Sequence, residues 1–351
     1  MAFPTGSTSS KITIDHTKVA GSSNLSNFPT LISGVNIPDG VWAAMQGDGD
    51  DIRFTTDALG TTQIAFEIVV LNKALKIAEI WVKIPTVNHG SATEIHMWFG
   101  DPTLSAYAVT DTYGRNAVWS DYVGVWHLQA NSNDSGAGGR NGTDSNISYT
   151  DDGLIENSAE LNGSNAVISL ADNAAYDVSN LTVQMMIRPD TPAGSTQGLF
   201  SHYFESGATR YGLRFFLSGG KLRMGVHDGS TATYAYSVGA TTLTDNAAVI
   251  VHGRYDHTAI KVFLDGVEDG TIAYTNNFNW TSCASPRIGV ENYTGSNTAW
   301  FDGGIDEVRY RGSALTSDWM LTEKEMFKNP STFLTMEDIS QAGGGFLLNF
   351  M

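Results

Sequence analysis

Alternating apolar and polar positions recur in short runs along the first third of the chain. The clearest run is KIAEIWVKIP, where Ile80, Val82 and Ile84 fall on one face of a strand and Trp81 and Lys83 on the other. The run TEIHMWF repeats this alternation and ends at a Gly-Asp-Pro turn, because proline has no N–H to give to a strand ladder. Together with KITI, PTLIS, DIRFTT and TQIAFEIVVL, these runs predict a first β-sandwich over residues 11–111.

A second set of runs begins with YVGVWHLQANSNDSGAGGRNGT, residues 122–143, where a short apolar strand enters a loop of Asn, Asp, Ser and Gly. About a dozen further strand candidates follow at short spacing, which is typical of a sandwich or jelly roll. Asp265 and Gly266 form the dipeptide of a tight hairpin. From Thr316 the pattern indicates a short helix, with Asp318 in its first turn and Lys324 near its end, as the helix dipole favours.

These patterns predict an all-β chain with two tandem sandwiches. We expect an N-terminal arm at residues 1–10, the first sandwich at 11–111, a linker at 112–121, the second sandwich at 122–329 and a tail at 330–351. The tail ends in an apolar cluster of Phe346, Leu347, Leu348, Phe350 and Met351. Because a large apolar cluster is unfavourable in contact with water, we expect the tail to dock onto a partner protein. The alternative is that the tail folds back onto the first sandwich.

Composition agrees with this organisation and excludes some partners. The chain has 37 glycines, and charged residues make up only 16%, as expected for strands and turns. The formal net charge is -17, and the 20 basic residues are scattered, so nucleic acid and anionic membranes are not expected partners. Cys283 is the only cysteine, which excludes an intramolecular disulfide. The N-terminal sequence MAFPTGSTSS lacks the features of a signal peptide, and no run is long enough to span a bilayer.

Two resemblances are carried by longer motifs. The segments YVGVWHL, DSGAGGRNGT, LNGSNAVISL, LTVQMMIRP, KVFLDGVEDG and GGIDEVRYRGSALTSDWM resemble a laminin-G-like module of the concanavalin A-like lectin and glucanase superfamily. Upstream, KITIDHTKVAGSSNLSNFPTLIS, DDIRFTTD, AEIWVKIPTV and IHMWFGDP resemble the uncharacterised bacterial and viral domain that commonly precedes such a module. The resemblance implies that the second sandwich is a concanavalin A-like jelly roll with a short C-terminal helix.

The resemblance also implies a structural calcium ion, which many such modules hold where the first loop meets a late strand. The implied ligands are Asp134 and Asn141 in DSGAGGRNG and Asp306 in GGIDEVRY. Calcium takes about six to eight oxygen ligands from carboxylates, amides and carbonyls. The alternative is that Asp134 and Asn141 only form turns and that Asp306 accepts a hydrogen bond from a loop.

Glycan binding and glycoside hydrolysis are the two small-ligand functions to weigh. Lectin sites combine an aromatic platform with amides and carboxylates. Six aromatic residues lie in or beside loops rich in Asn, Thr and Gly: Tyr203, Tyr234, Tyr236, Trp280, Tyr293 and Trp300. The Glu-x-Asp-x-Glu pattern of the retaining glucanases is absent, and the adjacent Asp306 and Glu307 point to opposite faces of a strand. We therefore expect no catalytic residues.

The resulting functional prediction is a non-enzymatic virion protein of a bacteriophage or similar virus. It would decorate the capsid or form part of a fibre or tail appendage, and it would display a lectin-like adhesion module that binds a cell-surface glycan. Assembly in the host cytoplasm explains how such a module reaches the exterior without a signal peptide. We expect a homo-oligomer or a lattice-bound protein whose terminal segments contact other virion proteins. The alternatives are a bacterial surface or secreted carbohydrate-binding protein, and a glycoside hydrolase.

Overall fold

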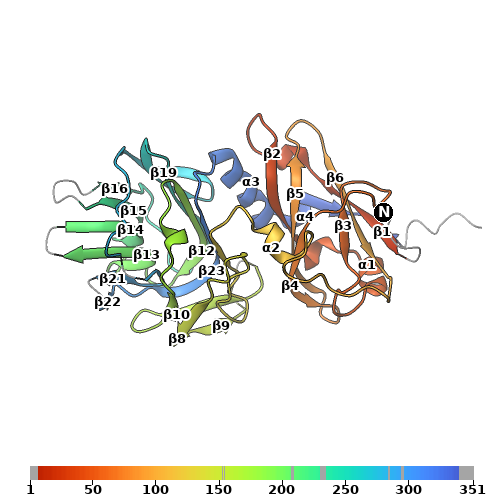
Figure 1. The fold of residues 1–351 in the computed structure, drawn as a ribbon, viewed down its shortest axis with the longest axis horizontal. Coiled ribbons are helices and arrows are strands. Elements are labelled where there is room, and N and C mark those ends of the chain that lie inside the picture. The colour runs from red at the N-terminus through yellow and green to blue at the C-terminus, as the bar shows by residue number, and fades with distance from the viewer. Residues whose placement is uncertain are drawn as a thin grey trace, which may run out of the picture. The chain divides into compact units, whose positions relative to one another are not determined.

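The chain forms two compact units of β-structure. The computed structural model describes residues 7–339 except 152, 154, 207–208, 230–234, 284 and 294–295. One unit comprises Met1–Val118 with Glu325–Met351, and the other comprises Trp119–Lys324 (Figure 1). The all-β prediction with two sandwiches and a short C-terminal helix is confirmed. In the described part of the chain, no helix is both long enough and apolar enough to cross a membrane.

The first unit contains a four-stranded sheet in the order β24-β1-β6-β3 and a three-stranded sheet in the order β2-β5-β4. Its strands are β1 (Thr8–Ile14), β2 (Leu25–Ser33), β3 (Arg53–Thr55), β4 (Phe66–Asn72), β5 (Ile77–Val87), β6 (Thr93–Phe99) and β24 (Leu334–Met336), and its helices are α1 (Asp39–Ala44), α2 (Arg115–Val118) and α4 (Pro330–Phe333). Ile80, Val82 and Ile84 of β5 are buried, as their alternation predicts. Trp81 is buried as well, and its ring packs against Phe327 at a centroid distance of 5.9 Å.

The C-terminal region contributes a strand to this first unit. In β24, Met336 pairs with Ile12 of β1, and Leu334 pairs with Ile14. The division of the chain therefore differs from the predicted one, in which residues 330–351 form a separate tail. Strand pairing explains the difference, because β1 would otherwise leave one edge of its backbone groups unpaired. The predicted docking residues Phe346, Leu347, Leu348 and Phe350 lie outside the described residues.

The second unit contains two large antiparallel sheets and a small hairpin. The first sheet runs in the order β19-β18-β17-β12-β23-β10-β9, with β7 also paired to β23, and the second runs β16-β15-β14-β13-β20-β11-β8. The strands are β7 (Gly124–Trp126), β8 (Gly142–Ser145), β9 (Ser148–Thr150), β10 (Ser158–Asn162), β11 (Val167–Leu170), β12 (Leu181–Pro189), β13 (Gln197–Ser206), β14 (Thr209–Ser218), β15 (Lys221–Asp228), β16 (Ala235–Val238), β17 (Val249–Tyr255), β18 (Ala259–Leu264), β19 (Val267–Ala273), β20 (Arg287–Ile288), β21 (Glu291–Tyr293), β22 (Ser296–Thr298) and β23 (Asp302–Arg311).

Local sequence signals place several of these elements. Leu264 pairs with Val267 across a turn in which Asp265 and Gly266 have φ values of 48° and 78°, as the Asp-Gly dipeptide predicts. The predicted C-terminal helix is α3 (Ser317–Lys328), and the boundary between the two units falls within it. A single apolar core formed from both large sheets holds the second unit together.

The alternation predicted for residues 304–310 breaks in the middle of β23. Glu307 has a φ of 49°, and the pairing with β12 shifts so that Glu307 and Val308 lie opposite Met185 alone. Because of this bulge, Ile305 and Val308 both belong to the core, although their spacing predicts opposite faces. The same bulge interrupts the strict alternation from which Asp306 and Glu307 are predicted to point to opposite faces, and both residues are buried.

Candidate functional site

The first loop of the second unit is organised around the carboxylate of Asp134. Its Oδ1 accepts hydrogen bonds from the backbone N–H groups of Val125 at 3.0 Å and Gly136 at 2.8 Å, and its Oδ2 accepts one from Arg140 at 2.8 Å. The side-chain oxygen of Asn141 accepts from the backbone N–H of Asp134 at 2.9 Å. Asp134 and Asn141 are therefore brought together, and these oxygens hold the loop against β7.

Asp306, the third implied calcium ligand, takes part in a different contact. Its Oδ2 accepts a hydrogen bond from the backbone N–H of Ile155 at 3.1 Å. This is the loop contact that the alternative interpretation expects. Both carboxylate oxygens of Asp134, the side-chain oxygen of Asn141 and Asp306 Oδ2 each accept a hydrogen bond from a backbone N–H, which fits a structural role for these residues. Calcium binding by these residues stays a prediction.

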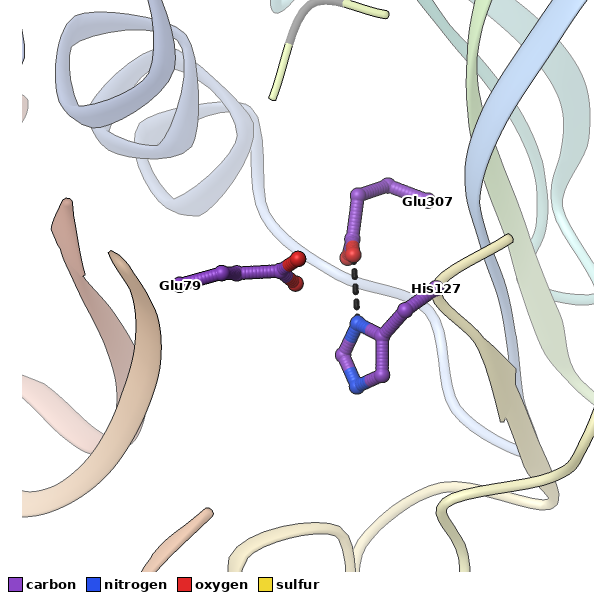
Figure 2. Close-up of side chains that lie close together, drawn as sticks. All are labelled: Glu79, His127 and Glu307. Atoms are coloured by element: carbon purple, nitrogen blue, oxygen red, sulfur yellow. Dashed lines mark hydrogen bonds and ion pairs between the residues drawn. The ribbon is translucent and has the colours of Figure 1, made fainter. Parts of the chain in front are cut away.

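A buried charged group lies beside the bulge in β23. His127 Nδ1 and Glu307 Oε1 share a hydrogen bond (Figure 2), and Arg309 Nε donates to Glu307 Oε2 at 3.0 Å. Burial opposes ionisation of Glu307, but the charges of His127 and Arg309 outweigh it and lower the pKa of Glu307 to about 2. Glu79, also drawn in Figure 2, belongs to the first unit, where its carboxylate accepts from Trp81 Nε1 at 2.8 Å. The two carboxylates thus have structural partners within their own units.

A second charged cluster lies on the face of the seven-stranded sheet that is turned away from the core. Arg214 of β14 donates from Nε and Nη2 to Glu291 at 3.0 and 2.7 Å, and from Nη1 to the hydroxyl of Tyr236 at 2.8 Å. Its guanidinium carbon lies 5.1 Å from the ring centre of Tyr203. Two of the six aromatic candidates, Tyr203 and Tyr236, therefore meet around one arginine. Tyr203 is completely buried and donates to Glu205, so it supports the sheet.

A depression in the described surface of the second unit lies at the end of this sheet. It has a volume of about 850 Å³. We call it the asparagine hollow, and the described residues that line it are Asp177, Asp228, Thr275, Asn276, Asn277, Phe278, Asn279, Trp280 and Thr281. The segment 275–281, which follows β19, supplies most of this lining. The hollow combines aromatic rings, amides, hydroxyls and carboxylates, the groups that polar ligands need.

Backbone contacts hold the segment 275–281 in place. The backbone N–H of Asn279 donates to the carbonyl of His227 at 3.0 Å, and Asn279 Nδ2 donates to the carbonyl of Asp228 at 3.3 Å. Asn276 Nδ2 donates to the Asp228 carboxylate at 2.6 Å, and the hydroxyl of Tyr255 donates to the Asn276 carbonyl. The segment is thus fixed to the end of β15, and its amides are held in defined positions.

The two aromatic residues that line the hollow, Phe278 and Trp280, belong to a stack of three rings. The rings of Phe278 and Trp280 lie 4.4 Å apart and 16° from parallel, and His202 stacks on Trp280 at 5.0 Å. Trp280 Nε1 donates to the carbonyl of Val178 at 3.2 Å. Phe278 packs edge-on against Tyr255, with 5.2 Å between the ring centres. Phe278 and Trp280 are half-buried, so each is anchored in the unit and presents part of its surface to the hollow.

The other predicted aromatic residues lie elsewhere. Trp300 is half-buried just before β23, where Ala299 accepts a hydrogen bond from Gly198 at the start of β13. Asp228, by contrast, pairs with Tyr211 near the N-terminal end of β14. Trp300 and the hollow are therefore near opposite ends of the sheet. Tyr234 and the side chain of Tyr293 lie outside the described residues.

Sequence reasoning identified Trp280 but missed the other residues of the hollow. The run Asn276 to Trp280, NNFNW, alternates amides with aromatic rings and could have indicated the site. Asp177 and Asp228 could not have been found in this way, since each is distant in sequence from that run. The fold and the hollow together define a β-sandwich module with an open surface that is polar and partly aromatic.

Comparisons with protein families agree with both resemblances. Residues 162–320 match the laminin-G-type family described as the concanavalin A-like lectin/glucanases superfamily. Residues 48–114 match a domain of unknown function (DUF2341). Among curated proteins, none matches the sequence significantly. The predicted concanavalin A-like domain and the domain that precedes it are thereby confirmed.

Several solved structures are distantly similar. Domain 4 of AbnA, an extracellular GH43 arabinanase from Geobacillus stearothermophilus solved with arabinotriose, is 22% identical, with 58% of this chain and 98% of that chain covered and a TM-score of 0.44. The binding domain of Paraclostridial Mosquitocidal Protein 1 is 14% identical, with 60% and 53% covered and a TM-score of 0.47, so the match spans about half of that structure. The Ruminococcus gnavus IT-sialidase CBM40 bound to α2,3 sialyllactose is 12% identical, with 43% and 85% covered and a TM-score of 0.37.

Proposed function

We propose that the second unit is a non-catalytic glycan-binding module and that the asparagine hollow is its binding surface. The observation that carries this proposal is the joint lining of one hollow by the Phe278 and Trp280 rings and by three asparagines. A sugar ring has an apolar face that packs on an aromatic ring, and it has hydroxyls that both donate and accept hydrogen bonds. Asparagine amides also do both. The hollow therefore offers each of the contacts that a sugar needs.

The fixed geometry of the hollow supports binding with little loss of entropy. Asn276 and Asn279 are held by Asp228 and by the backbone of β15, so their amides need little ordering when a ligand arrives. Trp280 is oriented by its ring stack and by its hydrogen bond to Val178. Asn277 is exposed and lines the hollow, which makes it a residue that can be changed without disturbing the core.

The direct test is a glycan array probed with the full chain, followed by calorimetric titration of the glycans that bind. Asn277→Ala and Trp280→Ala should each weaken binding, and we expect at least a tenfold loss for Trp280→Ala, equivalent to about 1.4 kcal/mol. Trp280→Phe should restore part of the affinity because it keeps a ring in the stack. Trp300→Ala is the matched control and should bind normally. Full affinity in Trp280→Ala and Asn277→Ala would refute this location of the site.

The same ligands test the non-catalytic part of the proposal. Two carboxylates, Asp177 and Asp228, line the hollow, and glycoside hydrolases also need a pair of carboxylates. Asn276 donates a hydrogen bond to the Asp228 carboxylate, and a carboxylate held in this way is suited to contact a ligand rather than to transfer a proton. The sequence also lacks the Glu-x-Asp-x-Glu pattern of the retaining glucanases. Each bound glycan is incubated with the protein overnight and the products are separated by chromatography. Cleavage that Asp177→Asn abolishes would overturn this part.

For the biological setting we propose the outside of a virus particle, where the module would be displayed for adhesion. This part rests on the sequence, in which an acidic chain ends in an apolar segment suited to contact with another structural protein. The test is fractionation of a lysate of the native source on a density gradient, with detection by mass spectrometry. Banding with virus-sized particles supports the proposal, and deletion of residues 343–351 should release the protein. Recovery only as a small species would favour a bacterial surface or secreted carbohydrate-binding protein instead.

A further inference from the structure

The first unit has a hollow of its own, with a volume of about 320 Å³. We call it the strand-edge hollow, and the residues that line it include Phe66, Glu67 and Ile68 of β4 together with Tyr107 and Val109. Val109 is an apolar residue that stays 47% exposed. Charged residues of both signs complete the lining. Apolar and aromatic groups bordered by charged ones are typical of a surface on which another segment docks.

The strand-edge hollow follows the outer edge of β4. This strand is the last in the order β2-β5-β4, and no strand in the described part of the chain pairs with its other edge. Successive side chains of a strand point to opposite faces, so a hollow lined by three consecutive residues follows the edge rather than one face. The N–H of Phe66 points to this edge and donates to the Tyr113 carbonyl at 3.1 Å. Ile68, two residues further on, presents its N–H and C=O to the same edge.

The aromatic side of the hollow is held in place. The guanidinium carbon of Arg53 lies 4.1 Å from the ring centre of Tyr107. Arg53 also donates to the carbonyls of Asp50 at 2.9 Å and Ser105 at 2.6 Å. The ring of Phe66 packs edge-on against Tyr107, with 6.1 Å between the ring centres. Because these rings have fixed positions, a segment that docks on them needs little reordering of the hollow.

The C-terminal chain runs toward the end of the sheet where this hollow lies. The N–H of Glu337, which follows β24, donates to the Lys11 carbonyl of β1 at 2.9 Å. Since β24 is antiparallel to β1, the next residues run toward Ser9, which pairs with Trp98 of β6. Trp98 pairs in turn with Arg53 of β3, a residue that lines the hollow. The tail therefore starts at the correct end of the first unit.

The length and pattern of the tail fit the hollow. Three strand spacings separate β24 from β3 in the order β24-β1-β6-β3, which amounts to about 14 Å. Residues 340–346 follow the last described residue and span up to about 23 Å when extended. Phe346, Leu348 and Phe350 occupy alternate positions, so an extended tail presents all three on one face. Residues 340–351 include no charged side chain, as suits an apolar docking segment.

We propose that residues 346–350 add to the outer edge of β4 as an extended segment and place their alternate apolar side chains in the strand-edge hollow of the same chain. The backbone of Ile68 pairs with the tail, and Val109 and the Tyr107 ring pack against its side chains. This inference concerns the free chain and is independent of the glycan site. In a virus particle, a neighbouring structural protein would have to displace the tail from the hollow before the tail could contact it.

The experiment uses the full chain and a full-chain variant that combines Phe346→Ser, Leu348→Ser and Phe350→Ser, which we call the tail-face variant. A synthetic peptide of residues 341–351 is titrated into each protein by calorimetry. In the unchanged chain, the tethered tail competes at an effective concentration of about 1 mM, so the peptide should bind at least about tenfold more weakly than to the tail-face variant. Amide hydrogen exchange in β4 should also be faster in the tail-face variant, because the edge of β4 loses its partner.

Further variants locate the docking surface. Val109→Asp, added to the tail-face variant, places an unpaired charge against the docked side chains and should weaken peptide binding by at least about tenfold. Leu59→Asp is the matched control, because Leu59 is 74% exposed and does not line the hollow, and peptide binding should be unchanged. A peptide with Leu347→Ser changes the opposite face of the segment and should keep most of its affinity.

Three outcomes would overturn the proposal. The first is a peptide that does not bind the tail-face variant, and the second is a peptide that binds the unchanged chain equally well. The third comes from sedimentation equilibrium of the two proteins. Self-association of the full chain that the tail-face variant lacks would place the tail on a second copy rather than on its own chain.

Discussion

Replacement of Asp134 tests whether one buried carboxylate organises the first loop of the second unit. Asp134 is 2% exposed and accepts hydrogen bonds from three backbone N–H groups, those of Val125, Gly136 and Arg140. Asp134→Ala removes both acceptor oxygens and with them all three hydrogen bonds. Each hydrogen bond to a charged group contributes about 1.5–3 kcal/mol, and a buried N–H left without a partner costs about 1–3 kcal/mol.

These contributions overlap, because the three N–H groups share one carboxylate and contacting groups are not additive. We therefore expect Asp134→Ala to lower the free energy of unfolding by about 4 kcal/mol. For a unit of this size, such a loss lowers the melting temperature by about 10 °C. Asp134→Asn keeps an oxygen for Val125 and Gly136 but places an NH₂ group against the N–H of Arg140. Its expected cost is intermediate, about 2 kcal/mol.

Scanning calorimetry of the full chain measures these changes, and Asp245→Ala, at an exposed position, is the control. A loss of less than about 1 kcal/mol in Asp134→Ala would refute the hydrogen-bond argument. The same scans in calcium and in EDTA test the metal prediction for Asp134, Asn141 and Asp306. If these residues bind calcium, EDTA lowers the melting temperature of the unchanged protein, and the variants lose that response. If the carboxylate acts through N–H groups alone, the ranking of the variants is the same in both buffers.

Three further perturbations have defined outcomes. Arg214→Met should lower the free energy of unfolding by about 3–5 kcal/mol, because it leaves the Glu291 carboxylate buried without its ion-pair partner. Adding Glu291→Leu should recover much of this loss in urea titrations. Equal stability of the single and the double variant would contradict this expectation. Burial lowers the pKa of His202 to about 4, so as the pH falls the unfolded chain takes up a proton at this residue before the folded protein does. The stability of the protein should therefore fall between about pH 6.5 and pH 4. Melting curves of His202→Phe should lack this part of the pH dependence. Gly266→Ala should lower the free energy of unfolding by about 2 kcal/mol in chemical denaturation, because the φ of Gly266 is +78° and the added methyl carbon would lie 2.7 Å from a backbone nitrogen of α3. Gly90→Ala is the control and should be nearly neutral, because its added methyl carbon would meet no atom within 4 Å.

The elements of the fold that depend on local chemistry could be predicted from the sequence. The alternation of Ile80, Val82 and Ile84 predicts the buried face of β5, and these residues are buried. The Asp265-Gly266 dipeptide predicts the hairpin between β18 and β19, because both residues accept a positive φ. The helix near Thr316 follows from its charge pattern. Each of these signals lies within a few residues, so neighbouring residues alone determine the outcome.

Pairings between distant segments could not be predicted in this way. The C-terminal β24 joins β1 across more than 300 residues of sequence, and no local signal in FLTM specifies that partner. The bulge at Glu307 depends on how β23 aligns with β12, so the period of two gives the wrong faces for Asp306 and Val308. The composition around Tyr203 predicts a binding residue, but the structure shows that Tyr203 is completely buried and that the Arg214 guanidinium packs over its ring.

The sequence alone determined the β-rich class, the positions of strands and turns, and the presence of amides and aromatic rings after β19. It determined these features because backbone preferences and side-chain periodicity act locally. Only the tertiary structure decided that Asp177 and Asp228 join Asn276 and Trp280 in one hollow. These residues meet because the two sheets close over a shared core and fix the end of β15 beside the segment 275–281. The combination of carboxylates, amides and aromatic rings in that hollow follows from packing between distant segments.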